Sequence, residues 1–133
     1  MSTNANTVRE IYEAFGRGDI PAILAKLDEN VEWEYGAAPH EVPWLQPRRG
    51  RTGAAEFFAS LAAVEFHSFV PKAILEGENL VVALTDLTLT VKKTGKKIVE
   101  EDEAHIWRFN AAGKVVRFRH CADTNQQVQA CRG

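Results

Sequence analysis

The sequence predicts an α+β fold, in which helices from the N-terminal half pack against one curved antiparallel sheet from the C-terminal half. Apolar residues recur at helical spacing in residues 7–27 and 52–64, and they alternate with polar residues from about residue 66 onward. Short polar turns separate the later strands. Helices collected on one side of an antiparallel meander make a two-layer architecture. The open end of such a curved sheet is a natural cavity.

Residues 7–18 are predicted to form the first helix. Thr7 and Glu10 make a capping-box pattern, in which each side chain satisfies a backbone N–H of the first turn. A second, shorter helix begins after Asp19, with Pro21 in its first turn. The buried stripe of the first helix is expected to contain Val8, Ile11, Ala14 and Phe15.

A turn at residues 28–30 and a strand at residues 31–35 are expected next, because apolar and polar residues alternate strictly in the strand. Residues 36–50 contain three prolines and two glycines and form a long loop. Loops of that length inside a compact domain are uncommon unless they are functional or mobile. Trp44 in its middle suits either a flap over a hydrophobic site or a loop packed on the surface. The inward side chains of the strand are expected to be Val31, Trp33 and Tyr35.

The third helix is expected at residues 52–64, with Thr52 as its N-cap. Two strands are predicted to follow, at about residues 66–75 and 80–92. Pro71 lies in the first of them and indicates an edge strand or a bulge, because proline cannot donate to the ladder. The apolar stripe of the helix consists of Phe57, Phe58, Leu61 and Val64.

The last hairpin, residues 100–123, carries ionisable side chains where a small sheet usually carries valine and isoleucine. Burying a charge costs free energy unless the charge is paired. One face of its first strand is therefore either the wall of a polar-spotted pocket or a wet sheet face. Residues from Gln126 onward are expected to form a short tail. The residues predicted on this face of the first strand of the hairpin are Glu101, Glu103, His105, Trp107 and Phe109.

Composition indicates one domain spanning residues 1–133, with 45% hydrophobic and 26% charged residues and a formal net charge of −2. The chain has no basic block, so nucleic acid and anionic membranes are not expected as partners. The polar N-terminus and the absence of a long apolar run predict neither a signal peptide nor a membrane span. Cys121 and Cys131 are expected to be free thiols in a reducing cytoplasm.

Three stretches of the chain resemble the SnoaL-like polyketide cyclases and ketosteroid isomerases of the nuclear transport factor 2-like superfamily. They read REIYEAFGRGDIPAILAKLDENVEW, RGRTGAAEFFASL and AHIWRFNAAGKVVRFRHCADT, and the third resembles the SnoaL-like subgroup most. The resemblance spans residues 7 to about 125. It implies a cone-shaped, curved, mixed or antiparallel sheet wrapped over three helices of the N-terminal half. Because this fold hosts many unrelated sites, the resemblance implies the fold more strongly than the reaction.

The residues that match the catalytic groups of ketosteroid isomerase differ in this chain. That enzyme uses an Asp base together with a Tyr and a protonated Asp that hold the enolate oxygen. The matching positions here are Tyr35, Ile11 and His105, with Tyr12 expected on another face of the helix. Steroid isomerisation is therefore not expected.

The SnoaL-like cyclases and the limonene epoxide hydrolases place a catalytic carboxylate near the end of the final strand, and Asp123 is the residue that matches it. The hydrolases also need a second Asp beside an Arg on an earlier strand. Asp86 lacks that Arg and is expected to point outward, so epoxide hydrolysis is not supported.

His105 and Asp123 are the predicted catalytic pair, because an imidazole and a carboxylate facing one cavity can pass a proton either way. The structural alternative is a His105 bonded to a backbone carbonyl and an Asp123 that only ends the strand. The expected substrate walls, which could equally be plain core, are Trp33, Tyr35, Trp44, Trp107, Phe118 and His120.

The predicted function is cofactor-free acid–base chemistry on a small apolar carbonyl compound, of the isomerase or cyclase type. The alternative is a non-catalytic module that binds a small hydrophobic molecule. No metal site is expected, because the four histidines lack His-x-His or i,i+4 spacing. A homodimer is expected, since two-fold dimers are the commonest soluble assembly.

Overall fold

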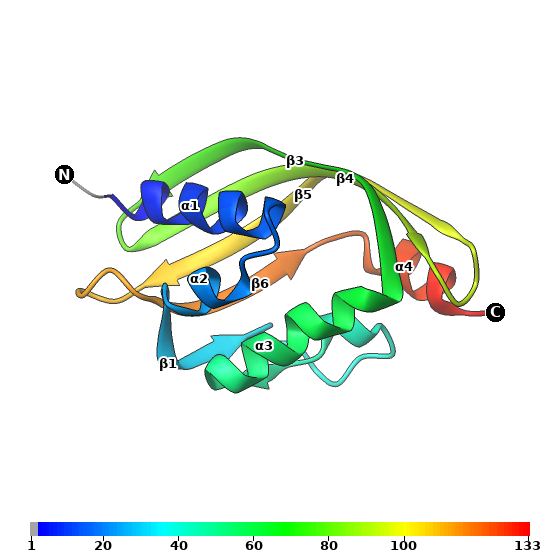
Figure 1. Ribbon diagram of the computed structural model, residues 1–133, viewed down its shortest axis with the longest axis horizontal. Coiled ribbons are helices and arrows are strands. Elements are labelled where there is room, and N and C mark those ends of the chain that lie inside the picture. The colour runs from blue at the N-terminus through cyan, green and yellow to red at the C-terminus, as the bar shows by residue number, and fades with distance from the viewer. Residues whose placement is uncertain (1–2) are drawn as a thin grey trace.

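Six strands form a single curved sheet in the order β2-β1-β6-β5-β4-β3 in the computed structural model, which describes residues 3–133 (Figure 1). Neighbouring strands are antiparallel except β1 and β6, which are parallel, so of the two expected alternatives, mixed and antiparallel, the sheet is mixed. The elements in chain order are α1 (Asn4–Gly16), α2 (Ile20–Leu24), β1 (Leu27–Trp33), η1 (Pro43–Leu45), β2 (Arg48–Arg49), α3 (Gly50–Ser60), η2 (Leu61–Ala63), β3 (Val64–Gly77), β4 (Leu80–Val91), β5 (Lys97–Phe109), β6 (Val115–Cys121) and α4 (Thr124–Cys131).

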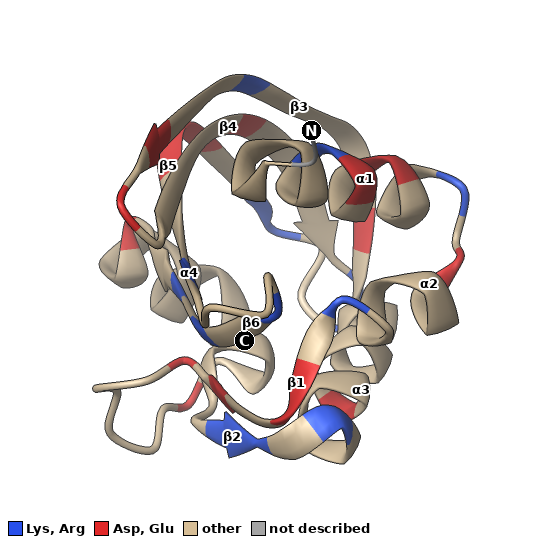
Figure 2. Cartoon of the chain, turned by 90° about the vertical axis from the view of Figure 1, so that its left-hand side faces the viewer, with Lys and Arg blue, Asp and Glu red and all other residues tan. Residues whose placement is uncertain are grey.

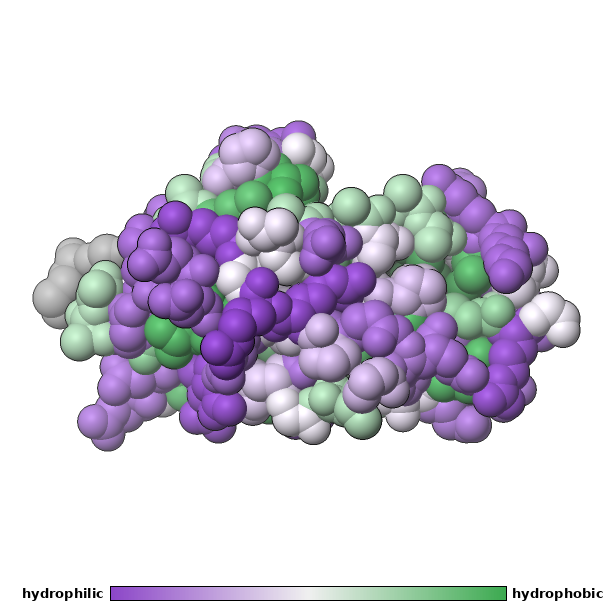
Figure 3. Space-filling model, turned by 90° about the horizontal axis from the view of Figure 1, so that it is seen from below, coloured by the Kyte–Doolittle hydropathy of each residue, from purple (hydrophilic) through white to green (hydrophobic). Residues whose placement is uncertain are grey.

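The helices of the N-terminal half lie on one side of the curved sheet, which confirms the predicted α+β architecture. Figure 2 shows β3, β4 and β5 arching over one side of the molecule, with α1, α2 and α3 on the other. The face seen in Figure 3 is mainly hydrophilic, with hydrophobic residues in scattered groups. The apolar side chains therefore gather between the two layers. The largest fully buried ones are Trp33, Phe118, Ile23, Leu27 and Ile98.

The first helix begins three residues earlier than predicted. Thr3, and not Thr7, is the N-cap, and its hydroxyl accepts a hydrogen bond from the Asn6 N–H at 3.1 Å. The earlier start buries Ala5, whose N–H donates to the Glu76 carboxylate at 2.8 Å. This tertiary contact favours the earlier cap over the capping-box pattern at Thr7. The second helix has the predicted N-cap, since Asp19 accepts from the Ala22 N–H.

Two other predicted boundaries are wrong. Residues 28–30 belong to β1, which pairs irregularly with β6 between Leu27 and Glu32. The third helix begins at Gly50, because β2 pairs with β1 and the chain then turns at Gly50 with a φ of +74°. Thr52 is exposed inside that helix and caps nothing.

The predicted tail from Gln126 is helix α4, which packs against β5. In β3, both readings of Pro71 are confirmed, since β3 is an edge strand and its pairing with β4 is irregular after that residue. Both cysteines are free. No helix within residues 3–133 is long and apolar enough to cross a membrane.

A β-bulge in β5 changes the face that was predicted for its acidic residues. Three steps along β5, from Glu100 to Glu103, match two steps along β4, from Leu87 to Thr85. The extra residue is accommodated at Asp102, whose φ is +63°. Glu100 is therefore buried and Glu101 exposed, whereas Glu103 keeps its predicted inward position.

Candidate active site

A cavity of about 70 Å³ lies between the sheet and the helices. Aromatic and aliphatic side chains form most of its wall, and the polar part of the wall comes from α1, β5, β6 and α4. Its polar lining residues are Tyr12, Glu103, His105, His120 and Gln127.

Glu103 and His105 reach this cavity from alternate positions of β5, on the inward side of the strand. The Nε2 atom of His105 lies 2.9 Å from Oε1 of Glu103, and both residues are buried. The indole N–H of Trp107 donates to the Tyr12 hydroxyl oxygen at 3.2 Å. Because an indole can only donate, the single hydroxyl hydrogen of Tyr12 is free to point to Nδ1 of His105, 2.6 Å away. This order of donors assigns the His105 hydrogen to Nε2, which donates it to Glu103.

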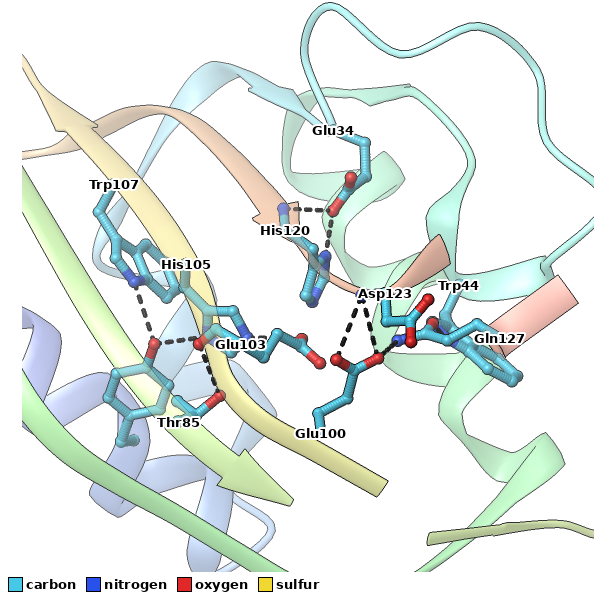
Figure 4. Close-up of polar contacts among 11 residues, drawn as sticks. Glu34, Trp44, Thr85, Glu100, Glu103, His105, Trp107, His120, Asp123 and Gln127 are labelled. Atoms are coloured by element: carbon cyan, nitrogen blue, oxygen red, sulfur yellow. Dashed lines mark hydrogen bonds and ion pairs between the residues drawn. The ribbon is translucent and has the colours of Figure 1, made fainter. Parts of the chain in front are cut away.

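The second histidine of the site, His120, comes from β6 and is the direct cross-strand partner of His105. Its ring stands edge-on to the ring of His105, with centroids 4.9 Å apart. Glu34 is buried just after the end of β1, and its carboxylate bonds both Nδ1 and the backbone N–H of His120. Figure 4 shows Glu103 and His120 pointing toward one another from neighbouring strands.

Burial and neighbouring charges move the pKa values of these groups in different directions. Burial lowers the pKa of His105 and so favours the neutral imidazole, although the bond to Glu103 acts in the opposite direction. Burial would also lower the pKa of His120, but the carboxylate of Glu34, together with the charges of Glu103 and Glu100, outweighs burial and raises that pKa. Burial opposes ionisation of Glu103, yet its bond to His105 and the charge of His120 lower its pKa. Burial raises the pKa of Tyr12, so its hydroxyl stays protonated.

One oxygen of Glu103 has no hydrogen-bond partner among the described residues. Oε1 is bonded to His105, whereas Oε2 is buried without any partner. Leaving a buried carboxylate oxygen unpaired costs about 1–3 kcal/mol, more if the group is charged. Glu103 lines the cavity, and a small rotation of its side chain would present this oxygen to a bound molecule.

A second polar network closes one end of the cavity. Gln127 of α4 accepts the indole N–H of Trp44 at 2.8 Å and donates to the carboxylate of Glu100 at 3.0 Å. The same carboxylate accepts the backbone N–H of Asp123 at 3.2 Å. The bulge in β5 therefore provides the carboxylate that holds the 36–50 loop and the C-terminal helix together (Figure 4).

Of the predicted site residues, His105, His120, Trp33, Trp44, Trp107 and Phe118 line the cavity. The expectation that Asp123 faces the same cavity as His105 is wrong. Asp123 is exposed, and its carboxylate caps α4 by accepting the Gln126 N–H at 3.1 Å. The helix that follows β6 was not expected, and it takes this side chain as its N-cap.

The expectation that Tyr35 points inward is also wrong. The strand ends at Trp33, and Glu34 has a φ of +57°, which breaks the alternation. The Tyr35 ring lies outside the cavity, with the Arg117 guanidinium 4.3 Å from its centroid. Asp86 points outward as predicted and pairs with Lys72 at 2.8 Å.

Sequence reasoning missed four polar residues of the site: Tyr12, Glu34, Glu103 as a buried partner, and Gln127. Tyr12 was expected on another face of its helix than the buried stripe, but it lies four residues after Val8 and three before Phe15. That spacing is a usable signal. Glu34 could not be found by alternation, because it follows the backbone irregularity at the end of β1.

The histidines and Glu103 also form a set of donors that could hold a metal ion. One ligand atom from each of Glu103, His105 and His120 lies within 4.8 Å of the other two. The spacing rule excluded a metal because it considers neighbours along one helix or strand. Here the two histidines are brought together by the register of β5 and β6.

The family model of the SnoaL-like domain matches residues 8–118. The chain belongs to the SnoaL-like domain family. Solved structures with this fold include a nuclear transport factor 2-like protein of unknown function from Burkholderia pseudomallei, which is 26% identical over 100% of both chains with a TM-score of 0.81. A nuclear transport factor 2-like protein from Burkholderia xenovorans is 26% identical over 99% of each chain, with a TM-score of 0.84.

Another neighbour in structure is Bal32a from a soil-derived mobile gene cassette. It is 24% identical over 97% of this chain and 96% of its own, with a TM-score of 0.79. No curated protein has a sequence detectably similar to this chain. The comparisons therefore establish the family and the fold, and the reaction has to be argued from the site.

Proposed function

We propose that this SnoaL-like protein is a small-molecule enzyme that moves a proton on a small, largely apolar carbonyl compound, using side chains alone. The observation that carries the proposal is that Glu103 lines a mostly apolar wall beside two histidines and has an unpartnered carboxylate oxygen, Oε2. A carboxylate lone pair in a water-poor cavity is well placed to remove a proton from carbon.

Each polar residue has a distinct role in this reaction. Glu103 accepts the proton from the carbon next to the carbonyl. His120, held by Glu34, donates a hydrogen bond to the carbonyl oxygen, where negative charge develops. His105 is a positioning residue, because its Nε2–H holds the other oxygen of Glu103. Tyr12 keeps His105 in the required tautomer.

The size and chemistry of the wall support an apolar, small substrate. A cavity of about 70 Å³ is smaller than the engineered cavities of about 150 Å³ that take up benzene. A ring-sized substrate therefore needs side chains of the wall to move. Trp44 belongs to the long 36–50 loop, so it is the wall side chain best placed to move aside for such a substrate.

The names of structural neighbours agree with this class of reaction. Proteins of this fold from Rhodopseudomonas palustris and Mesorhizobium loti have been assigned provisionally as an isomerase and a SnoaL-like polyketide cyclase. TerC, another neighbour, was co-crystallized with polyporic acid. These proteins are 16–22% identical to this chain, so they support only the proposal about the class of ligand that the fold can hold, and not the reaction.

The experiment follows exchange of hydrogen for deuterium at carbon. A panel of small aryl and alkyl ketones is incubated with the protein in D₂O, and loss of the proton signal next to the carbonyl is measured by NMR. Glu103→Gln is expected to slow enzymatic exchange by at least about 100-fold, the lower range for a general base. Glu101→Gln is the matched control, because Glu101 is exposed on the same strand. Exchange by Glu103→Gln at the wild-type rate would exclude the proposal.

The second candidate is a module that binds a small hydrophobic molecule without turning it over. The mostly aromatic lining of the cavity favours it. It predicts that ligands raise the melting temperature by mass action in wild-type protein and in Glu103→Gln alike, with no deuterium exchange in either.

A further inference from the structure

The cluster of Glu103, His105 and His120 has the composition of a transition-metal site. Two imidazole nitrogens and one carboxylate oxygen lie within 4.8 Å of one another. Two histidines and one carboxylate leave coordination positions open for water or substrate, as in many zinc and iron enzymes. The ligand atoms are about 3.3 Å apart around a tetrahedral ion with bonds of about 2.0 Å, so side-chain shifts of about 1 Å are enough.

Each histidine has an outer partner that leaves its Nε2 for the cluster. Nδ1 of His120 is bonded by Glu34, and Nδ1 of His105 lies 2.6 Å from the Tyr12 hydroxyl. Histidines that bind metals through one nitrogen usually donate the other N–H to a carboxylate or a similar acceptor, which fixes the ring. Glu34 is such an acceptor for His120, and the Tyr12 oxygen becomes one for His105 when the His105 hydrogen moves from Nε2 to Nδ1 and the Tyr12 hydroxyl hydrogen turns away.

A second observation points to an occupant of the cluster. Glu103 is only 5% exposed, and its Oε2 has no partner in residues 3–133. His105 is 4% exposed, so bulk water does not satisfy this region well. An ion at the centre of the three groups would bond the orphaned oxygen and compensate for the burial of its charge.

We infer that Glu103, His105 and His120 form a binding site for one divalent first-row transition-metal ion, with Zn²⁺ the best fit. Imidazole and carboxylate ligands suit zinc, which accepts mixed nitrogen and oxygen donors without a strong geometric preference. Because a neutral imidazole binds the ion through Nε2, the hydrogen of His105 moves from Nε2 to Nδ1 as the ion enters, and the Tyr12 oxygen then accepts it. The fourth position faces the aromatic cavity.

Metal binding and the proposed proton transfer exclude one another, a consequence that rests on the proposed function. The ion occupies the Glu103 oxygen that would accept the proton and the His120 nitrogen that would bind the carbonyl. The metal-bound protein is then the inactive form. Binding of the ion itself does not depend on this and is measured without any substrate.

The test uses Co²⁺ as a spectroscopic probe for zinc, with tag-free protein that has been treated with a chelator and dialysed. One equivalent of Co²⁺ is expected to produce visible d–d absorption, and one equivalent of Zn²⁺ is expected to abolish it. Glu103→Gln and His120→Gln are each expected to weaken binding by more than about 100-fold, and Glu34→Gln by about 10- to 100-fold. His67→Gln is the control, because His67 is an exposed histidine bonded to Thr90.

The outcomes separate this inference from the proposed function. No cobalt absorption at saturating Co²⁺, or equal affinity in Glu103→Gln, His120→Gln and wild type, overturns the metal site. If circular dichroism shows that Glu103→Gln or His120→Gln does not fold, the other variant and Glu34→Gln still test the metal site. Cobalt binding, with no deuterium exchange by the metal-free protein, supports the metal site and removes the proton-transfer proposal. Deuterium exchange by the metal-free protein, with no cobalt binding, does the reverse. Loss of binding in Cys121→Ser/Cys131→Ser would show that the thiols bind the ion, and would overturn the assignment.

Discussion

The Tyr12 hydroxyl is expected to contribute measurably to the stability of this SnoaL-like protein. It is the only described partner of the Trp107 indole N–H and of Nδ1 of His105. Both of these residues are buried, at 2% and 4% exposure. Tyr12→Phe keeps the ring and its packing against Trp107, but it leaves two buried polar atoms unpaired.

Each unpaired atom costs about 1–3 kcal/mol, and part of the cost is offset because phenylalanine has no hydroxyl to desolvate. We therefore expect Tyr12→Phe to lower the free energy of unfolding by about 3 kcal/mol. A chain of this size has a total stability of about 7–20 kcal/mol, so the variant should still fold. The melting temperature is expected to fall by about 6–12 °C.

The assay is urea unfolding followed by tryptophan fluorescence, with Tyr35→Phe as the matched control. The Tyr35 hydroxyl accepts one exposed hydrogen bond from Arg108 at 3.2 Å, and its loss should change stability by no more than about 0.5 kcal/mol. If Tyr12→Phe destabilised the protein no more than Tyr35→Phe does, the assigned chain of donors from Trp107 to Glu103 would be refuted.

Five further substitutions test other parts of the structure. Gly50→Ala should lower the free energy of unfolding by about 1–2 kcal/mol, because φ is +74° and a Cβ would lie 3.3 Å from the Glu29 carbonyl oxygen. Gly16→Ala, in open space within helix α1, should raise it by about 0.5–1 kcal/mol; both changes are measured by urea unfolding. Asp123→Ala should lower the free energy of unfolding by about 1 kcal/mol through loss of the helix cap, whereas Asp123→Asn should change neither stability nor deuterium exchange. Slowed exchange in Asp123→Asn would contradict the assignment of the base to Glu103. Burial, aided by the charges of Glu103 and Asp123, raises the pKa of Glu100, so the folded state holds this proton more tightly than the unfolded state does. The stabilisation is complete below the unfolded pKa of Glu100 and disappears as the pH rises through the folded one. The free energy of unfolding of Glu100→Gln, measured with urea, should therefore decline less than that of the wild type as the pH rises through this range. Identical pH profiles of the two proteins would refute the raised pKa of Glu100.

Long-range organisation was predicted from the sequence because alternation and helical spacing extend over many residues. The α+β class, the outward Asp86 and the prediction of an edge or a bulge at Pro71 follow from such patterns, whereas a mixed or antiparallel curved sheet was implied by the family resemblance. The errors arose where tertiary contacts or backbone irregularities decide. Thr7 has the capping-box pattern, and the contact of Ala5 with Glu76 accompanies the earlier cap at Thr3.

The candidate site was predicted in part, for the same reasons. Four aromatic wall residues and two histidines follow from strand alternation and the family resemblance. Glu100 could not be placed inside, because the bulge at Asp102 shifts the alternation by one position. Ile11 was assigned to the inward face of the first helix, and Tyr12 was therefore expected on another face. Both residues line the cavity.

The extra residue in β5 also separates two tasks along a single strand. Ahead of it, Glu100 bonds to Gln127 of the last helix, which in turn bonds to the tryptophan of the long loop; beyond it, Glu103 bonds to His105 in the cavity wall. Since the two acids bond to different partners, access to the interior could be retuned by mutation at the first without disturbing the second. A family that uses one scaffold for many small molecules would gain from such a division.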